Sequence, residues 1–550
     1  GGYLVYYGNP VEAIEYFKKA DNQINSDEGE CPVCGNVNPE MIFNIIEAQV
    51  VDEYGNYTEK RKVIPTEWEN MYKTKVQNPR IQDAEDLPEG TLNVPGWFSQ
   101  CKIYLKRDAL SKISNTQYIL MNLLEAPVLA FILSYLIRYI ADPNSNVYIF
   151  RDNENFPRYI FMSIVVALFL GLTVSAEEIF KDRKILKREK FLNLSRSSYL
   201  ISKILIMIII GAIQAFLFTL VGNLILSVPG MFFQYWLTLF LTFVLAALIG
   251  LNISQTFNSA VTIYILIPFI LIPMMALGGA MFTFDKLNRS IGSVGKVPVI
   301  ADMMPSKWAY EALMVNQFKN NKLTKEFFEV EQQESNADFK KVHYIPTLRD
   351  RLQKAVDDYD NQSKRSSVEH DIKLLFNEFS IQQKETGLAF KQLGKLTYKT
   401  FDDKVVAECY EYLDKLDTNY SRQFDEAYKT KERYIAYYTI PTKERFNRLK
   451  DKYQNESLKE IVKNVYEKNK ILVYDSRIIQ QVDPVYLEPD QTNFIGIRSH
   501  FYAPHKFFMG KKYDTFWFNI IVLFIMTSLL YIPLYFEWIL KALTGFGNLT

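Results

Sequence analysis

Histidine and cysteine are the side chains here whose types could bind a metal or take part in catalysis. The histidines are His343, His370, His500 and His505. They form no H-E-x-x-H or related motif, so hydrolase and metalloprotease sites are not predicted. Cys31 and Cys34 form one C-x-x-C pair, but a tetrahedral zinc site needs four ligands, and neither a second pair nor a nearby histidine follows. We predict no catalytic residue, no cofactor and no metal site, and leave zinc at this pair open as the alternative.

Charged side chains of both signs crowd residues 178–203, where they could form ion pairs. The acids are Glu178, Asp182 and Glu189, and the segment from 181 onward holds eight basic residues: Lys181, Arg183, Lys184, Lys187, Arg188, Lys190, Arg196 and Lys203. Basic residues in short loops mark the cytoplasmic side of a membrane protein. We therefore predict that this segment is cytoplasmic.

The elements beside this segment read as membrane spans. Residues 204–284 contain no Asp, Glu, Lys, Arg or His over 81 positions, and about 20 apolar residues cross a bilayer once. We divide this run into three spans at 228–231 and 252–259, which are a turn signal and a polar patch. Residues 117–140, 159–176 and 516–540 are three further apolar segments. The sequence thus predicts six spans and a mainly α fold.

Six spans place both ends of the chain in the cytoplasm and about 190 residues between spans 5 and 6 outside. This outer region reads as long polar helices that pair as hairpins, with Cys409 its lone cysteine. Residues 94–113 are predicted to form an interfacial helix; an ordinary amphipathic core helix is the alternative.

The composition of the chain limits the classes of binding partner that can be predicted. Lys and Arg number 63 against 62 Asp and Glu, a net charge of +1 that gives no argument for nucleic acid. The chain begins Gly1-Gly2 without an initiator Met, which suggests a fragment. No G-x-x-x-x-G-K-[ST] phosphate loop occurs, so no ATPase site is expected in these residues.

Four stretches together resemble a known family. They are 175–189 (SAEEIFKDRKILKRE), 197–203 (SSYLISK), 305–318 (PSKWAYEALMVNQF) and the opening GGYLVYYG with Tyr16-Phe17, Cys31-Pro32 and Asn38-Pro39. Their order and spacing resemble the G subfamily of ABC exporters, the white and pleiotropic drug resistance type, which has an ABC-2 type permease. Asp182 stands where that family usually has Glu, and the long outer insert is not typical of it.

The resemblance implies a domain plan. Residues 1–92 would be the tail of a nucleotide-binding domain with its linker, 93–115 a connecting helix, and 116–318 spans 1 to 5 with a coupling loop at 178–203. Residues 319–512 would be an extracytoplasmic helical domain and 513–550 span 6 with a tail. It further implies an upstream nucleotide-binding domain that uses ATP and Mg, and a homodimer or paired half-transporter in a lipid membrane. The expected location is a bacterial inner membrane, with 319–512 periplasmic.

In such a transporter the charged loop would couple the ATPase to the spans. The coupling residues we predict are Glu178, Asp182, Arg183, Arg188 and Glu189. The alternative is that these charges only set the orientation of the chain in the membrane. That would explain the basic residues but not the acids that lie between them.

Spans 2 and 5 would line the substrate path. Span 5 contains Pro268, Pro273 and Gly278-Gly279, so we expect it to be broken or closely packed. The predicted pathway and gate residues are Leu168, Thr173, Met274, Met275, Ala280 and Met281. Ala280 and Met281 are smaller than the family's usual gate pair, and core packing is the alternative for the methionines.

The spans offer almost no charge to a substrate, so an apolar or amphipathic one is favoured. Glu125, in span 1 before Ala126-Pro127, is the exception: a structural hydrogen bond or a proton relay could explain it. The leading hypothesis is the permease portion of an ATP-driven exporter. The alternative is a mechanotransmitter whose outer domain acts on an envelope partner. A secondary transporter is disfavoured because no internal repeat occurs.

Overall fold

A computed structural model describes residues 2–24, 26–27, 40–75, 95–189, 194–440, 442–489 and 498–547. The fold is mainly helical, as predicted. The chain divides into two compact units, 1–93 and 94–550, each of which is described by itself. Cys31 and Cys34 lie outside the described residues.

The first unit is small. Its elements are α1 (Pro10–Ala20), α2 (Glu40–Ile46), β1 (Gln49–Val51), β2 (Tyr57–Arg61) and α3 (Pro65–Lys75), and the two strands pair antiparallel. Phe17, Ile45 and Trp68 form its core, with the rings of Phe17 and Trp68 in edge contact at 5.3 Å.

The second unit contains a bundle of apolar helices. They are α5 (Thr116–Ile137), α6 (Phe156–Ser175), α8 (Arg196–Ile225), α9 (Phe232–Thr256), α10 (Ala260–Ala276), α19 (Thr515–Leu529) and α20 (Tyr531–Phe536). By length and composition, five helices of the described part of the chain could cross a membrane, with α19 and α20 counted as one. The predicted fifth span corresponds to α10, which has only 17 residues and ends before Gly278.

The helices α6 and α9 form the centre of the bundle. In their most apolar windows, 72% of α6 and 83% of α9 is buried, against 17% of α5. Glycines allow the close approach: a Cβ on Gly171 would meet the backbone of α9, and one on Gly250 would meet Ser175 of α6. The helix α5 instead packs on α8 at the periphery, so most of its apolar surface remains uncovered.

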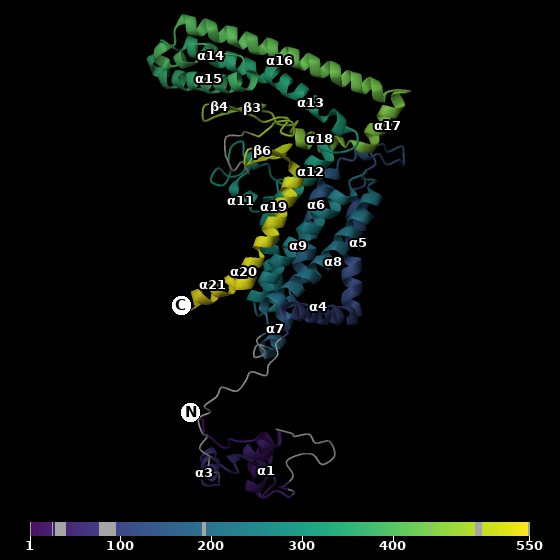
Figure 1. Ribbon diagram of the computed structural model, residues 1–550, viewed down its shortest axis with the longest axis vertical. Helices are drawn as coiled ribbons and strands as arrows, with labels where there is room; N and C mark the ends of the chain where they lie inside the picture. The colour runs from purple at the N-terminus through teal and green to yellow at the C-terminus, as the bar shows by residue number, and fades with distance from the viewer. Residues whose placement is uncertain are drawn as a thin grey trace. The chain divides into compact units, whose positions relative to one another are not determined.

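The bundle has two distinct ends (Figure 1). At one, which we call the α7 end, lie α4 (Trp97–Ser114), α7 (Glu178–Glu189) and α21 (Trp538–Gly547). At the other, the α12 end, lie α11 (Val299–Asp302) and α12 (Pro305–Lys319). The turn between α8 and α9 reaches α12, where Asn316 Nδ2 is 3.2 Å from Met231 Sδ. Successive apolar helices therefore run between the two ends in alternation.

Residues 319–512, which we call the insert, lie beyond the α12 end. The helices of the insert are α13 (Thr324–Phe339), α14 (Ile345–Asp357), α15 (Arg365–Thr386), α16 (Asp403–Tyr438), α17 (Lys443–Tyr453) and α18 (Glu456–Lys463). A π-helical turn, η4 (Lys340–Tyr344), joins α13 to α14. The long α16 packs along α13 and α14, and Leu348, Leu375 and Leu413 are fully buried between these helices and α15. Helices therefore do pair in the insert.

Two β-hairpins, which the sequence did not predict, complete this region. They are β3 (Ile471–Tyr474) with β4 (Arg477–Gln480), and β5 (His505–Phe508) with β6 (Lys511–Asp514). Their registers pair Ile471 with Gln480 and His505 with Asp514. The second hairpin leads directly into α19.

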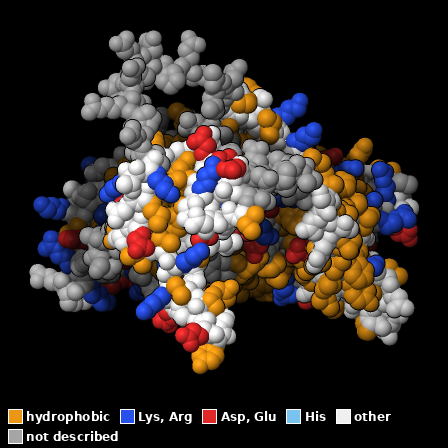
Figure 2. All heavy atoms as spheres, turned by 90° about the horizontal axis from the view of Figure 1, so that it is seen from below, with side chains coloured by type: hydrophobic (Ala, Val, Ile, Leu, Met, Phe, Trp, Pro, Cys, Tyr) orange, Lys and Arg blue, Asp and Glu red, His pale blue; other side chains and the backbone are white. Residues whose placement is uncertain are grey.

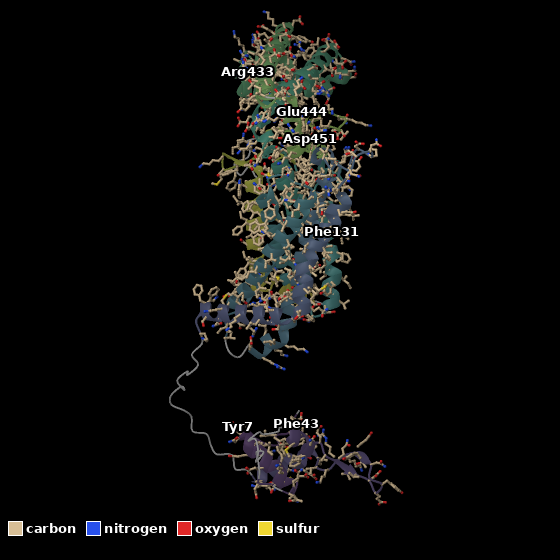
Figure 3. The ribbon with its side chains drawn as sticks, turned by 90° about the vertical axis from the view of Figure 1, so that its right-hand side faces the viewer. Tyr7, Phe43, Phe131, Arg433, Glu444 and Asp451 are labelled. Carbon is tan, nitrogen blue, oxygen red and sulfur yellow. The ribbon has the colours of Figure 1, made fainter. Side chains whose placement is uncertain are left out.

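Surface chemistry separates the bundle from the insert. Phe131, 53% exposed on α5, stands among carbon-rich side chains, whereas nitrogen and oxygen tips surround Arg433, Glu444 and Asp451 in the insert (Figure 3). Hydrophobic side chains also form broad areas in the view of Figure 2, interrupted by charged ones. Exposed apolar helices of this kind are typical of a membrane-embedded bundle.

Candidate coupling and pathway sites

Lys203 is the centre of a charge cluster at the α7 end. Its side chain is only 3% exposed, and its Nζ lies 2.9 Å from Asp108, 3.2 Å from Glu178 and 2.9 Å from Asp182. Lys112 Nζ contacts Asp108 at 3.1 Å and Glu178 at 2.6 Å. Because Asp108 and Lys112 come from α4 and Lys203 from α8, the cluster fastens α7 to both helices.

Burial and charge act in opposite directions on Asp108. Burial alone raises the pKa of its carboxyl group, but the ammonium groups of Lys203 and Lys112 outweigh burial and hold that pKa below its usual value. The carboxylate therefore stays ionised at neutral pH. Tyr199 OH also donates to Asp182 at 3.0 Å, so Asp182 is held from α8 by two side chains.

The first turn of α7 is capped by a side chain from another helix. The N–H groups of Ile179 and Phe180 donate to Ser254 Oγ, near the end of α9, at 3.1 and 3.0 Å. Arg183 donates to the backbone carbonyls of Ser254 and Gln255. Ordinarily a residue of the helix's own chain segment satisfies these free N–H groups. Here the cap joins α7 to α9.

The remaining predicted coupling residues lie at the far end of α7. Glu189 pairs with Arg107 of α4 at 2.6 Å, whereas Arg188 is exposed and has no ion pair among the described residues. Four of the five predicted residues are therefore fixed to neighbouring helices, and Arg188 points to solvent.

A second set of contacts fixes the junction of α20 and α21. Arg196, at the start of α8, pairs with Glu537 at 2.7 Å, and Gln255 Nε2 donates to the same carboxylate at 3.1 Å. Glu537 has a φ of 56°, which ends α20 in the left-handed region. Sequence reasoning assigned no site role to Asp108, Lys112, Lys203, Ser254 or Glu537. The spacing of Asp108 and Lys112, four apart on a helix, was the available signal.

Two of the predicted pathway residues, Ala280 and Met281, line a cavity, and the other four do not line that cavity. Leu168 is fully buried in the core of α6 and α9, and Met274 is 7% exposed. Thr173 is partly exposed and donates to Phe169 O at 2.9 Å. Met275 is partly buried and packs against the same core.

Ala280 and Met281 follow the end of α10, and Ala280 packs against the core that contains Leu168 and Met274. Both line a cavity of about 920 Å³ that continues into the insert. Gly278 and Gly279 precede them in close packing: a Cβ would come within 2.9 Å of Phe161 on Gly278 and within 2.5 Å of Phe501 on Gly279. The predicted close packing of this span is therefore confirmed at the glycine pair.

Glu311 is the centre of a second buried charge cluster, at the α12 end. It is 0% exposed and lies 2.6 Å from Lys506 Nζ and 3.3 Å from Lys307 Nζ, and Asn519 of α19 donates to it at 3.1 Å. Burial alone raises the pKa of Glu311, but the two ammonium groups lower it to about 2. The cluster joins α12 to β5 and α19.

The insert also contacts the loop between α5 and α6. Asn455 Nδ2 donates to the carbonyls of Phe150 and Asn153 at 2.9 and 2.8 Å, while its Oδ1 caps α18 at Leu458. Arg151 pairs with Asp451 at 2.5 Å. These contacts hold the insert to the bundle at a place separate from the Glu311 cluster.

Metal binding gains no support from this geometry. Among the described residues no three His, Cys, Asp or Glu side chains are grouped so that they could hold a metal ion. His505 instead lies 3.0 Å from Glu488, and His500 Nε2 lies 2.9 Å from the carbonyl of Pro484.

Comparisons with known proteins agree with the membrane part of this description. Residues 99–318 match the family described as ABC-2 type transporter, a segment that runs from α4 to the end of α12 and stops at the insert. The chain is 24% identical over 254 residues to the ABC transporter G family member STR of Medicago truncatula, covering 46% of this chain and 30% of that protein. It is 24% identical over 174 residues to the ABC transporter ATP-binding/permease protein Rv1747 of Mycobacterium tuberculosis, covering 29% of this chain and 19% of that protein.

The chain therefore spans less than one third of the length of either relative. The matched residues hold α4 to α12 and with them the Lys203 cluster. Together, the apolar helices and the family match support a membrane protein with a transporter component, similar over residues 99–318 to ABC-2 type transporters.

Proposed function

We propose that this chain is the permease portion of an ATP-driven exporter that moves an apolar or amphipathic substrate out of the cytoplasm. The observation that carries the proposal is the attachment of α7. One face of this short charged helix is fixed to α4, α8 and α9, and its other residues, such as Lys187 and Arg188, are exposed. A rigid helix held in this way can pass a push on its exposed face to three helices of the bundle.

The force would come from a nucleotide-binding domain that uses ATP and Mg. The relative from Mycobacterium tuberculosis is named an ATP-binding/permease protein, and this chain has no phosphate-binding loop. We propose that the nucleotide-binding domain belongs to the same polypeptide, upstream of these residues. The α7 end would then be cytoplasmic, and the insert would be periplasmic at a bacterial inner membrane.

A second copy or a paired half-transporter would complete the substrate path. Uncovered apolar side chains remain on α6 and α10, where Phe169 is 39% and Phe269 71% exposed. Contact between two such faces would bring Thr173 and the exposed side of α10 toward a common axis. The spans hold few charges, which favours an apolar or amphipathic substrate over an ion.

Transport in sealed vesicles tests the proposal. The full-length protein is reconstituted, and ATP-dependent movement of a hydrophobic dye is followed together with ATP hydrolysis. Arg183→Glu should abolish dye movement and change ATP turnover, because it places a carboxylate against the carbonyls of Ser254 and Gln255. Lys102→Glu reverses an exposed charge on the neighbouring helix α4 and serves as the matched control. Equal transport by both variants would sink the coupling role of α7.

The mechanotransmitter remains a second candidate because the insert is fixed at two places, through Asn455 and through Glu311. Movement of the spans would therefore move the insert. Deletion of residues 325–505 separates the two functions. If the chain is part of an exporter, dye transport survives the deletion. If it is a mechanotransmitter, the deletion abolishes the function that depends on the partner.

A shorter deletion guards against misfolding. Lys341 Nζ lies 5.8 Å from the ring centroid of Phe424, so removal of 342–423 joins two neighbouring points and leaves both attachments in place. The dye used with both deletions carries no charge, because the deleted residues include part of the wall of a cavity. Loss of its transport in this variant, with the bundle still folded, would favour mechanical work by the insert.

A further inference from the structure

The cavity beyond α10 has the size of a ligand-binding site. Its volume is about 920 Å³, and it lies between the segment that follows α10 and the helices and β3–β4 hairpin of the insert. Sites for small molecules in proteins fall at roughly 300 to 1,000 Å³. The family match stops at residue 318, so the walls supplied by the insert lie outside the matched residues.

The side of the cavity next to the bundle is apolar. Met281 lines it and is 56% exposed. The rings of Phe284 and Phe501 meet edge to face at 4.9 Å beside it, and Tyr310 and Tyr502 continue this aromatic surface. An exposed methionine beside aromatic rings is an adaptable surface for an alkyl or aryl group.

The opposite wall contains the irregular turn of the insert. Lys340 and Tyr344, the first and last residues of the π-helical turn η4, both line the cavity. Lys340 Nζ lies 4.1 Å from the ring centroid of Tyr344 and 3.5 Å from Glu385. Single π-helical turns inside α-helices occur frequently at functional sites because they displace side chains from the regular helix face.

Carboxylates outnumber cations on the lining, which holds seven Asp and Glu against five Lys and Arg. Most of the acids have a basic partner, as Glu378 has Arg477 at 3.1 Å and Glu467 has Lys286 at 3.0 Å. Among the described lining residues, the acids Asp285, Glu460 and Asp475 have no ion pair, against one such cation, Lys296; the carboxylate of Glu460 accepts from Tyr466 OH at 2.8 Å. The lining thus combines an excess of unneutralised negative charge with an apolar surface.

We propose that this cavity binds a cationic amphiphile, with its apolar part against Met281, Phe284 and Phe501 and its positive charge on the side of Glu460 and Asp475. This names a substrate class for the exporter proposed above and rests on that function for the route by which the ligand arrives. Binding itself requires neither nucleotide nor transport, so the two proposals can fail separately.

Protection of a cysteine at the apolar side tests the site. Met281→Cys is made in the full-length protein with Cys31 and Cys34 replaced by Ser, since Cys101 and Cys409 are buried. The protein in nanodiscs, without nucleotide, is labelled by a polar maleimide with and without a dansyl-alkylammonium probe. At ten times its dissociation constant the probe should slow labelling about tenfold, because about nine sites in ten are occupied.

Val342→Cys provides the matched control, since Val342 is 50% exposed on the same π-helical turn and does not line the cavity. Its labelling should not change. Unchanged labelling at position 281, or equal slowing at both positions, overturns the site whether or not the protein transports dye.

The charge of the ligand is tested by two further comparisons. A sulfonate analogue with the same tail should protect position 281 less than the ammonium probe. Glu460→Gln and Asp475→Asn should each weaken the ammonium probe about two- to fivefold, the range for partly exposed ion pairs. Glu444→Gln, an exposed acid away from the cavity, is the control. Equal protection by both probes overturns the assignment of a cationic ligand.

Discussion

Replacement of Lys203 by Met tests the charge cluster at the α7 end most directly. The substitution keeps an unbranched apolar stem and removes the ammonium group that three carboxylates share at 2.9 to 3.2 Å. Asp108 and Glu178 keep Lys112 as a partner, whereas Asp182 loses its cation. The variant therefore leaves one carboxylate uncompensated.

The expected loss of stability follows from the one carboxylate that is left without a cation. A fully buried charge left without its partner destabilises a protein by roughly 3 to 5 kcal/mol. Asp182 is 21% exposed and keeps its hydrogen bond from Tyr199, so solvent and the hydroxyl group reduce the penalty. We expect Lys203→Met to lower the free energy of unfolding by about 2 to 3 kcal/mol.

A second substitution should restore much of the loss. Asp182→Asn removes the uncompensated charge, so the double variant should be more stable than Lys203→Met alone, although it carries one more change. Thermal unfolding of both single variants, the double variant and Lys102→Met, which removes an exposed lysine of α4, is followed in the same nanodiscs. A double variant that unfolds at the sum of the two single shifts or below would refute the reasoning, because the cluster would then contribute nothing beyond two independent side chains.

Three other expectations concern single positions. Glu311→Gln should destabilise the protein by about 3 kcal/mol near neutral pH. Because the folded pKa of Glu311 is lowered from 4.5 to about 2, its contribution is complete above pH 4.5, and the difference in unfolding midpoint between the variant and the parent should shrink as pH falls toward 2. Gly279→Ala should lower the free energy of unfolding by about 2 to 4 kcal/mol, because Gly279 has a φ of +84° and an added Cβ would lie only 2.5 Å from Phe501. Gly510→Ala is the control: Gly510 has a φ of +77° but an added Cβ would meet no atom, so this variant measures the backbone contribution alone. Ser254→Ala should cost about 1 kcal/mol in thermal unfolding and weaken the link between ATP hydrolysis and dye transport, because it removes the cap of α7.

Each of these expectations has a result that contradicts it. A constant midpoint difference for Glu311→Gln from pH 7 to 2 excludes a carboxylate with a lowered pKa. Equal losses for Gly279→Ala and Gly510→Ala exclude the contact with Phe501. Ser528→Ala removes an exposed hydroxyl of α19 that bonds only within its own helix, so an equal effect of Ser254→Ala excludes a special role for the cap.

Local composition was sufficient to predict the apolar helices. The charge-free run 204–284 was divided into three spans at 228–231 and 252–259. The structure ends α8 at Ile225, runs α9 from Phe232 to Thr256 and starts α10 at Ala260. The turn between α8 and α9 can be predicted from adjacent residues. A span can likewise be predicted from a run of apolar residues long enough to cross a bilayer, without knowledge of distant contacts. The same locality explains why α10 was placed correctly, although it has only 17 residues.

Contacts between distant segments were not predictable in this way. Glu178 and Asp182 were selected as site residues, but Lys203, the cation that they share, was not. Lys203 also pairs with Asp108 of α4, which is 95 residues away in the sequence. The strands β3 to β6 have four residues each, too few to show alternation. Their turns are Asp475-Ser476 and Met509-Gly510, all at positive φ, and neither has the Asn-Gly or Asp-Gly signal of such turns.

The pairing of α12 with α19 fixes an order of events during synthesis. Asn519 Nδ2 donates to Trp308 O at 3.1 Å across 211 residues of chain, so the last apolar helix reaches its place only after the whole insert has been made. At about 5 to 20 residues per second, that interval lasts on the order of 10 to 40 s. Throughout it, Glu311 lacks both Lys506 and Asn519, and the surface of α9 and α12 that later receives α19 remains open. Most of the insert is therefore synthesised before its second attachment can form, and arrival of α19 closes the bundle and completes the buried charge cluster.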